Sequence, residues 1–233
     1  MGIKERHERE RETVRRAILD AARDLFTAEG YRNVSVRKIA ERIEYSPAAI
    51  YSYFPSKDDI FFALAEEGFQ RLFELSQKTP AGPTPLDTVR CQLGNVYAFS
   101  VESPEHFALM FMDRSVPRIR QHYQRFPHLA EMRSNLAAVL VSCVEAGQLP
   151  ATTAPLAALK LLLNAVVGAA VTRLCNRLGP GEDGEALAHD AIELTLAGLR
   201  SGVPLRFQAV PFGKSPTSAA ETATEPACRA ANQ

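Results

Sequence analysis

The sequence has no net charge, because 27 lysine and arginine residues balance 27 aspartate and glutamate residues. Bulk charge therefore gives no sign of a nucleic-acid-binding protein, and any basic surface must be local. A sustained alternation of apolar and polar residues is also missing, which argues against β-strands. The composition, 46% hydrophobic and 23% charged, is that of an ordinary soluble globular protein.

Cysteine is scarce and scattered. Cys91, Cys143, Cys175 and Cys228 form no CxxC pair and suggest neither a zinc site nor a disulfide framework. The first three lie in apolar helical patterns and are interpreted as small buried thiols. There is no other metal-ligand spacing, no phosphate-binding loop and no nucleophile with an obvious base. We therefore expect no metal, no cofactor and no enzymatic activity.

Long hydrophobic runs are missing as well. The longest apolar stretch, residues 156–171, contains Lys160 and Asn164 and is short of a membrane span. The N-terminal segment KERHERERETVRR has no apolar core of the kind that signal peptides contain, and Arg6 stands where a myristoylation motif needs Ser or Thr. The expected location is the cytoplasm, with no membrane partner.

Helical periodicity is present along nearly the whole chain. An apolar stripe covers residues 12–29, and Gly30 is placed to end that helix. Short helical patterns follow Ser35 and Ser46-Pro47, residue types that begin helices. Ser56 precedes a longer helix that runs to about residue 78.

A linker, TPAGPTP at residues 79–85, opens the second half of the chain. Further helices are expected at residues 85–101, 104–114, 127–147, 153–178 and 184–201. The tail at 203–233 is rich in Ala, Thr, Ser and Pro, cannot bury enough apolar surface to fold alone, and is expected to be disordered. We expect an all-α protein with one domain at 12–57, a connecting helix at 56–78 and a second domain at 79–202.

The two short helices have the arrangement of a helix-turn-helix, whose second helix lies in the major groove of DNA. Five basic and two acidic residues between positions 31 and 57 give this segment a local charge of +3. Small outward side chains let the backbone approach base edges, and hydroxyls and cations bind phosphates. The alternatives are that these charges are ordinary solvated ones, and that Tyr53 is a half-buried core residue. The candidate DNA-contacting residues are Ser35, Arg37, Ser46, Pro47, Ala48, Ala49, Tyr51, Ser52, Tyr53 and Lys57.

The segment SVRKIAERIEYSPAAIYSYFPSKDDIFFAL, with ILDAARDLFTAEGYRNVSV before it, resembles the DNA-binding domain of the TetR family of bacterial transcriptional regulators. The resemblance covers about residues 12–65. The family pattern is matched in order and spacing by Phe26, Gly30, Tyr31, Ser35, Val36, Ile39, Ala40, Ser46, Ile50, Tyr51, Tyr53, Phe54, Lys57, Asp58 and Asp59. Glu44 departs from the pattern, because the family usually has Gly in that turn. Tyr53 stands where His is common.

The resemblance implies phosphate contacts at Ser35 and Arg37, and a phosphate anchor at Lys57. It implies a major-groove face made of Ser46, Pro47, Ala48 and Tyr51. It also implies an all-helical C-terminal domain that binds a small molecule and forms a dimer through its last two long helices. The expected function is a ligand-responsive regulator, a repressor by family habit, that binds a palindromic operator as a homodimer. The alternatives are a DNA-binding protein without an effector and, less favoured, a helical enzyme.

Two sets of residues in the second half are candidates for sites. An aromatic and thioether cluster could line a cavity for an apolar ligand or could be packed core: Phe99, Phe107, Met110 and Phe111. The last two helices fit either a homodimer interface or the core of a monomer, and the candidate interface residues are Leu163, Val167, Ala170, Leu194 and Ala197. His106, His122 and His128 lie near several arginines, where a solvated surface is favoured over an anion site.

Overall fold

The computed structural model describes residues 2–112, 116–117 and 119–209, which contain helices and no strand. The first helices are α1 (Ile3–Glu29), α2 (Val36–Arg42), α3 (Pro47–Tyr51) and α4 (Lys57–Lys78). They are followed by α5 (Pro85–Glu102), α6 (Pro104–Phe111), α7 (Pro127–Glu145), α8 (Pro155–Leu174) and α9 (Gly184–Arg200). Short 3-10 helices lie at Tyr31–Asn33 and Ile119–Arg125. The all-α prediction is confirmed.

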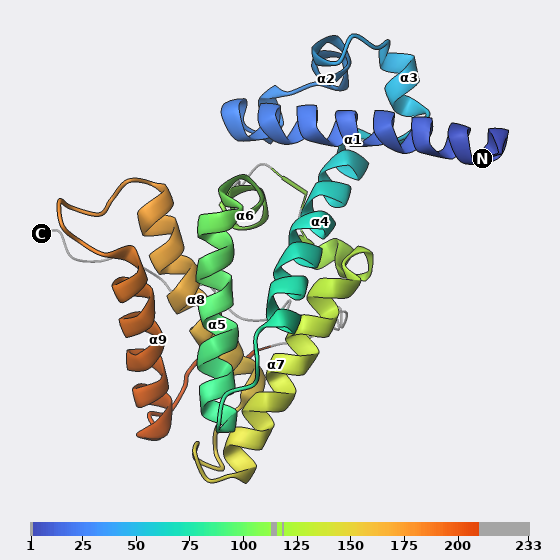
Figure 1. Cartoon of the computed structure of the whole chain (residues 1–233). Helices are drawn as coiled ribbons and strands as arrows, with labels where there is room; N and C mark the ends of the chain where they lie inside the picture. The colour runs from blue at the N-terminus through green and yellow to red at the C-terminus, as the bar shows by residue number, and fades with distance from the viewer. Residues whose placement is uncertain (1, 113–115, 118, 210–233) are drawn as a thin grey trace, which may run out of the picture.

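The helices form two parts joined by α4. Helix α1 lies across one end of the molecule, and α2 and α3 pack on its outer side (Figure 1). Helix α4 leads from this unit into the body, where it packs against α5 and α7, and α8 and α9 pack closely together (Figure 1). Helix α6 contacts α1, α4 and α5 and therefore lies where the two parts meet.

The expected helix starts are confirmed by their hydrogen bonds. Ser35 Oγ accepts from the Lys38 amide at 3.2 Å, and Ser46 Oγ accepts from the Ala49 amide at 3.1 Å. Ser56 caps α4 in the same way, at 3.1 Å from the amide of Asp59. Each cap satisfies an amide that has no partner inside its helix. These bonds fix where α2, α3 and α4 begin.

The turn between α2 and α3 contains Glu44 in a left-handed conformation, with φ of +59°. A side chain in this region costs about 1 kcal/mol relative to glycine. The turn nevertheless closes, because the Tyr45 amide donates to the Ala40 carbonyl at 2.9 Å. The departure from the family pattern therefore leaves the geometry of the helix-turn-helix intact.

The core of the N-terminal part is continuous with that of α4. Ile39, Ala40 and Ile50 from the two short helices are fully buried. The Tyr31 ring lies between those of Phe26 and Phe61, with centroid distances of 5.1 and 5.7 Å. Because Phe61 belongs to α4, this aromatic group attaches the helix-turn-helix to the helix that enters the body.

Several boundaries differ from expectation. Helix α1 begins nine residues before the expected residue 12. Helix α6 ends three residues early, and α8 is shorter at both ends because Pro155 starts it and Asn176, with φ of +53°, follows its end. Cys143 is buried as expected, but Cys91 is only half-buried and Cys175 is exposed. Residues 203–209 are described and are not helical, while the remainder of the expected tail and Cys228 lie outside the described residues.

Candidate nucleic-acid interface and ligand cavity

The outward face of α3 consists of small and hydroxyl-bearing side chains around one tyrosine. Tyr51 is 53% exposed and points outward, as its position in the sequence predicts. Ser46, Pro47, Ala48 and Ser52 are also exposed. With no long side chain besides Tyr51, the α3 backbone can approach the edges of base pairs closely.

Ala49 and Tyr53 are half-buried, so the ambiguity over Tyr53 resolves toward a position at the edge of the core. The Arg11 guanidinium lies over the Tyr53 ring, 5.8 Å from its centroid. These two residues therefore form the border of the α3 face, on the side where α1 begins.

The cations around this face differ in how freely they can bind phosphate. Arg37 is exposed, and its Nε donates to Glu41 Oε1 at 2.8 Å. An exposed pair of this kind contributes well under about 1 kcal/mol, so a phosphate can displace the carboxylate. Ser35 is exposed beside it at the start of α2.

Lys57 has a structural task that sequence reasoning did not identify. Its Nζ donates to the carbonyl oxygens of Tyr31 and Val34, both at 2.9 Å, and lies 4.1 Å from the centroid of the Tyr31 ring. Burial lowers the pKa of Lys57, although nearby Asp58 opposes this. An ammonium group has three donors, so one remains for a phosphate. Lys57 therefore holds the segment before α2 against the start of α4.

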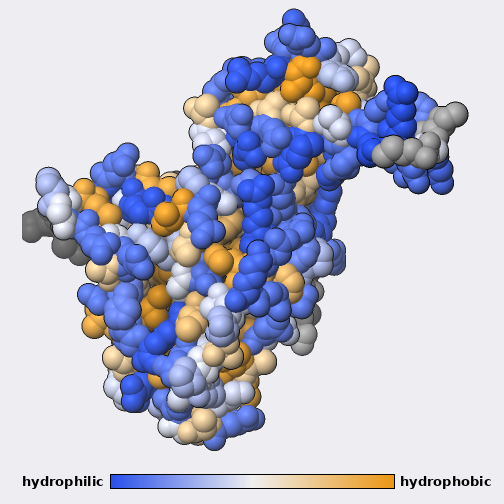
Figure 2. Space-filling model, viewed as in Figure 1, coloured by the Kyte–Doolittle hydropathy of each residue, from blue (hydrophilic) through white to orange (hydrophobic). Residues whose placement is uncertain are grey.

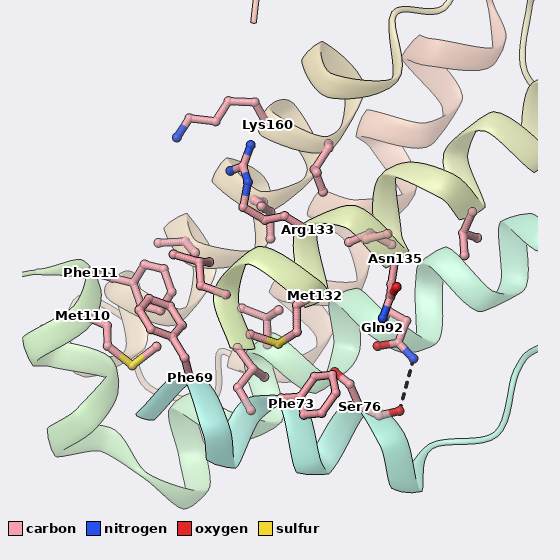
Figure 3. Close-up of a pocket in the computed structure, with 18 of the residues that line it drawn as sticks. Phe69, Phe73, Ser76, Gln92, Met110, Phe111, Met132, Arg133, Asn135 and Lys160 are labelled. Carbon is pink, nitrogen blue, oxygen red and sulfur yellow. Dashed lines mark hydrogen bonds between the residues drawn. The ribbon is translucent and has the colours of Figure 1, made fainter. Parts of the chain in front are cut away.

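A cavity of about 450 Å³ lies in the body, a volume within the usual range of small-molecule sites. Its walls come from α4, α5, α6, α7 and α8 and are largely apolar (Figure 3). The apolar lining includes Phe69, Phe73, Val96, Met110, Phe111, Met132, Leu136, Leu159, Leu163 and Val167.

The polar groups of the cavity lie apart from one another. In Figure 3, Arg133 and Lys160 extend on one side, whereas Gln92, Asn135 and Ser76 lie together at another. Gln92 Nε2 donates to the Ser76 carbonyl at 3.3 Å. The cavity thus has an apolar body, one cationic edge and one amide-lined edge.

The aromatic and thioether cluster predicted from the sequence is divided between the cavity and the core. Met110 and Phe111 line it, but Phe99 and Phe107 do not. These two rings are buried in the core between helices, 6.4 Å apart. The sequence does not separate these two groups, because apolar residues cover several sides of α5 and α6 and do not show which side faces empty space. The lining residues of α4 and α7 were missed for the same reason.

The candidate interface residues fall into different environments. Leu163 and Val167 line the cavity, and Ala170 is fully buried within the chain. Leu194, by contrast, is 74% exposed, and Ala197 is exposed one turn further along α9. The difference has a physical cause: α8 is apolar on more than one side, and packing within the chain occupies two of those sides.

Helix α9 carries two apolar stripes. One stripe is buried against the body: Ala188, Ile192, Leu196 and Leu199. The other, outward stripe is exposed at Leu187 and Leu194 and half-buried at Ala191 and Gly198. Figure 2 also shows apolar residues at the surface over α5 and α9. A solvent-facing stripe at helical spacing is the pattern of a helix that packs against a second helix.

Helix α8 has an unusually apolar composition. Among the described residues it alone is long and apolar enough to cross a membrane, with a mean hydropathy of 1.7 over 18 residues. That test uses length and composition alone, and the apolar core helix of a folded protein passes it as well. The apolar residues of α8 are explained by the cavity, by α9 and by an outward side that includes Gly168.

His106 on α6 lies between the two parts of the molecule. It is 2% exposed, which contradicts the expected solvated position, and its Nε2 is 3.6 Å from Glu67 Oε1 on α4. Glu67 accepts hydrogen bonds from Arg16 of α1 at 2.8 Å and from Arg71 at 2.5 Å. Burial, together with the charge of Arg71, lowers the pKa of His106 to about 4. The imidazole is therefore neutral in the folded protein at neutral pH.

No group of three or more metal-ligating side chains occurs within the part of the chain that the structure describes. The structure has an exposed short helix, α3, at one end and an apolar cavity in the body. A helix of this kind fits the major groove of DNA. Neither feature presents a cluster of groups for covalent chemistry.

Comparison with known proteins agrees with this arrangement. Residues 18–64 match the family model of bacterial regulatory proteins, tetR family. YuxN of Bacillus subtilis, an HTH-type transcriptional regulator, is 30% identical over 102 residues, which cover 43% of this chain and 35% of that protein. The chain thus spans about a third of that relative's length. The repressor AcnR of Corynebacterium glutamicum is 26% identical over 189 residues, covering 78% of this chain and 92% of AcnR.

A solved structure extends the likeness to the body. FadR of Bacillus subtilis, a transcriptional regulator in complex with stearoyl-CoA, superposes with a TM-score of 0.66 at 18% identity. The match covers 78% of this chain and 97% of FadR, and at this identity it shows the shared fold. The sequence match is confined to the helix-turn-helix, and the structural match shows the fold of the whole. Residues 18–64 thus carry the helix-turn-helix of the bacterial regulatory proteins of the tetR family, within a chain that has the fold of FadR.

Proposed function

We propose that the protein is a dimeric transcriptional repressor that binds a palindromic DNA operator and releases it when a small molecule enters the cavity. The observation that carries this proposal is the exposed, capped α3 with Tyr51 at its centre, placed above a body that contains an apolar cavity. In this proposal residues 12–57 bind DNA, α4 connects, and residues 79–202 bind effector and partner. The protein acts in the cytoplasm as a regulator and not as an enzyme.

The DNA contacts divide into two kinds. Ser46, Pro47, Ala48, Tyr51 and Ser52 meet the base edges of the major groove. Ser35, Arg37 and Lys57 bind phosphates, with Ala49 and Tyr53 at the edge of the contact. The test is binding of the purified protein to DNA from its own upstream region at several salt concentrations. Specific binding that weakens steeply with salt and protects a palindrome supports the proposal, and sequence-indifferent binding opposes it.

Replacing Tyr51 by Ala should weaken operator binding by tenfold or more, since a good base contact contributes about 1–3 kcal/mol. Tyr51 is 53% exposed, so the melting temperature should change little. Titration of a labelled operator measures the loss. Tyr51→Phe is the matched control, because it keeps the ring and removes only the hydroxyl. An unaltered affinity of the alanine variant would remove Tyr51 from the contacts.

The partner in the dimer is a second copy, joined through the outward stripe of α9 and the outward side of α8. A two-fold dimer can place two α3 helices about 34–36 Å apart, one turn of DNA, and so read a palindrome. The exposed apolar residues of α9 support this arrangement, because a solvated monomer gains nothing from a leucine as exposed as Leu194.

The effector is an elongated apolar molecule with an anionic end. The apolar walls fit its body, and the edge with Arg133 and Lys160 fits its charge. Stearoyl-CoA, the ligand in the FadR structure, has both kinds of surface. Helix α6 transmits effector binding to the DNA-binding part. Met110 of this helix lines the cavity, and His106, one turn earlier, contacts the α1–α4 junction.

Filling the cavity should abolish the response to such a ligand. Leu163→Phe adds a ring to the wall and should reduce, by tenfold or more, the affinity for a long-chain acyl-CoA. The ligand-induced rise in melting temperature measures this effect. Val141→Phe, at an exposed position of α7, is the matched control and should respond like the unaltered protein. If the unaltered protein shows no rise with acyl-CoAs of any chain length, the effector has a different chemistry.

A further inference from the structure

The first turns of α1 project beyond the rest of the DNA-binding part. Helix α1 starts at Ile3, and residues 4–13 are all exposed. In Figure 1 this end extends past α3, and in Figure 2 it is hydrophilic. At 1.5 Å per residue, the nine residues before position 12 add about 14 Å of helix. We call residues 3–11 the α1 overhang.

The overhang has a different character on each side. Lys4 and Arg11 are seven residues apart, which is two helical turns, and so share one side. That side faces α3, because the Arg11 guanidinium lies over the Tyr53 ring at 5.8 Å from its centroid. It continues the stripe that further along α1 includes the buried Ile18.

The cations on the other side are engaged within the overhang itself. Arg6 Nε pairs with Glu10 at 2.9 Å, and Arg9 Nε donates to the Glu5 carbonyl at 3.3 Å. Among the described residues, neither Lys4 nor Arg11 lies within ion-pair distance of a carboxylate. Glu8 lies on the same side as Lys4 and Arg11, four residues after the first and three before the second. The two cations that have no ion pair therefore lie, with one acidic residue between them, on the side that faces α3.

From this geometry we propose that the α1 overhang binds the phosphate backbone of DNA just outside the sequence that α3 reads. The inference rests on the proposed operator binding. When α3 occupies a major groove, the sugar-phosphate strand bordering that groove lies beside α3, on the side where the overhang projects. Lys4 and Arg11 then each neutralise a phosphate, which releases counterions and adds affinity independent of sequence.

The test compares two double variants that remove the same charge from the same helix. Lys4→Ala with Arg11→Ala removes both positive charges from the side toward α3. Arg6→Ala with Arg9→Ala removes two positive charges from the other side. Alanine keeps the helix, which circular dichroism verifies. Each variant is titrated, over a range of salt concentrations, with an operator duplex trimmed at the outer edge of the half-sites. The same titration is repeated with a duplex about ten base pairs longer at each end.

On the long duplex, K4A/R11A should bind on the order of tenfold more weakly than the unaltered protein. Its salt dependence should fall by about one unit for each lost phosphate contact, up to four in a dimer. R6A/R9A should bind like the unaltered protein, and on the trimmed duplex all three proteins should bind alike. Equal losses in the two variants, or indifference of the unaltered protein to duplex length, would overturn the proposal.

The proposed function and the overhang can fail separately. If no upstream duplex is bound specifically, operator binding is in doubt. The phosphate contacts are then tested with an arbitrary 30-base-pair duplex at low salt, because they do not depend on sequence. If K4A/R11A binds that duplex more weakly than the unaltered protein and R6A/R9A binds it equally well, the overhang contact is supported. Equal affinities of the two variants refute it.

Discussion

Replacing Leu194 by Glu should convert the protein to a monomer and lower its operator affinity by a hundredfold or more. The substitution places a charge in the middle of the outward stripe of α9, where the proposed dimer would bury it without a partner. Loss of the dimer also removes the gain from binding two half-sites at once, which commonly reaches 10²–10⁴. This is the largest effect on function that we expect from one exposed residue.

The variant should fold normally, because Leu194 is 74% exposed in the single chain. Light scattering after size exclusion measures the mass, and titration of the operator measures the affinity. Val141→Glu introduces the same charge at an exposed position of α7 and should remain a dimer with full affinity. A dimeric L194E protein would show that the outward stripe of α9 has another use.

Acidification from pH 7 to pH 4.5 should destabilise the protein by about 2–3 kcal/mol through His106 alone. Burial holds the pKa of this histidine at about 4, below its value of about 6.5 in an unfolded chain. Between these values the unfolded state binds more protons than the folded state. The stability is therefore fully present above pH 6.5 and is lost at about 1.4 kcal/mol per unit as the pH falls toward 4.

The charged groups that face His106 explain why its pKa is lowered, and they define the pH range in which His106 alone changes the stability. Arg71 and Glu67 lie on α4, and Arg16 and Arg23 lie on α1. Burial alone would raise the pKa of Glu67, but hydrogen bonds and charge from Arg16, with the charge of Arg71, hold it below the usual range. The contribution of Glu67 is therefore lost only below about pH 4.5, so the window from 6.5 to 4.5 separates His106 from its neighbour.

Urea unfolding at half-unit pH intervals measures this dependence, with His106→Gln as the comparison. The variant cannot gain a proton at this position, so its stability should fall much less between pH 6.5 and 4.5. Curves that run parallel in the two proteins would show that other groups cause the loss. Because His106 joins α6 to α1 and α4, protonation should loosen the junction between the two parts first.

The parts of the fold that were predictable from sequence are those fixed by local chemistry. Ser35, Ser46 and Ser56 cap the helices that their positions indicated, and Gly30 ends α1 with φ of +79°. The early start of α1 was not predictable from periodicity, since the overhang has no apolar stripe. Contacts such as that between Arg6 and Glu10, four residues apart, accompany its helical form.

The candidate sites were predictable only in part, because tertiary packing decides which side of an apolar helix is left uncovered. Phe107 and Met110 are one turn apart on α6, yet one is core and the other lines the cavity. On α8, Leu163 and Val167 face the cavity, so the sequence identified an apolar helix but not its division of surfaces. Lys57 shows the same limit, because no local pattern reveals that its ammonium binds two carbonyls.

The division of α8 has a consequence for how two effector molecules would influence each other. One side of this helix forms a wall of the cavity, and the proposed dimer places its other side against the partner. A helix is only about 10–12 Å across with its side chains, and packed interfaces shift as units. Two cavities separated by one such helix from each protomer should fill cooperatively, so effector titration should give a Hill coefficient above one.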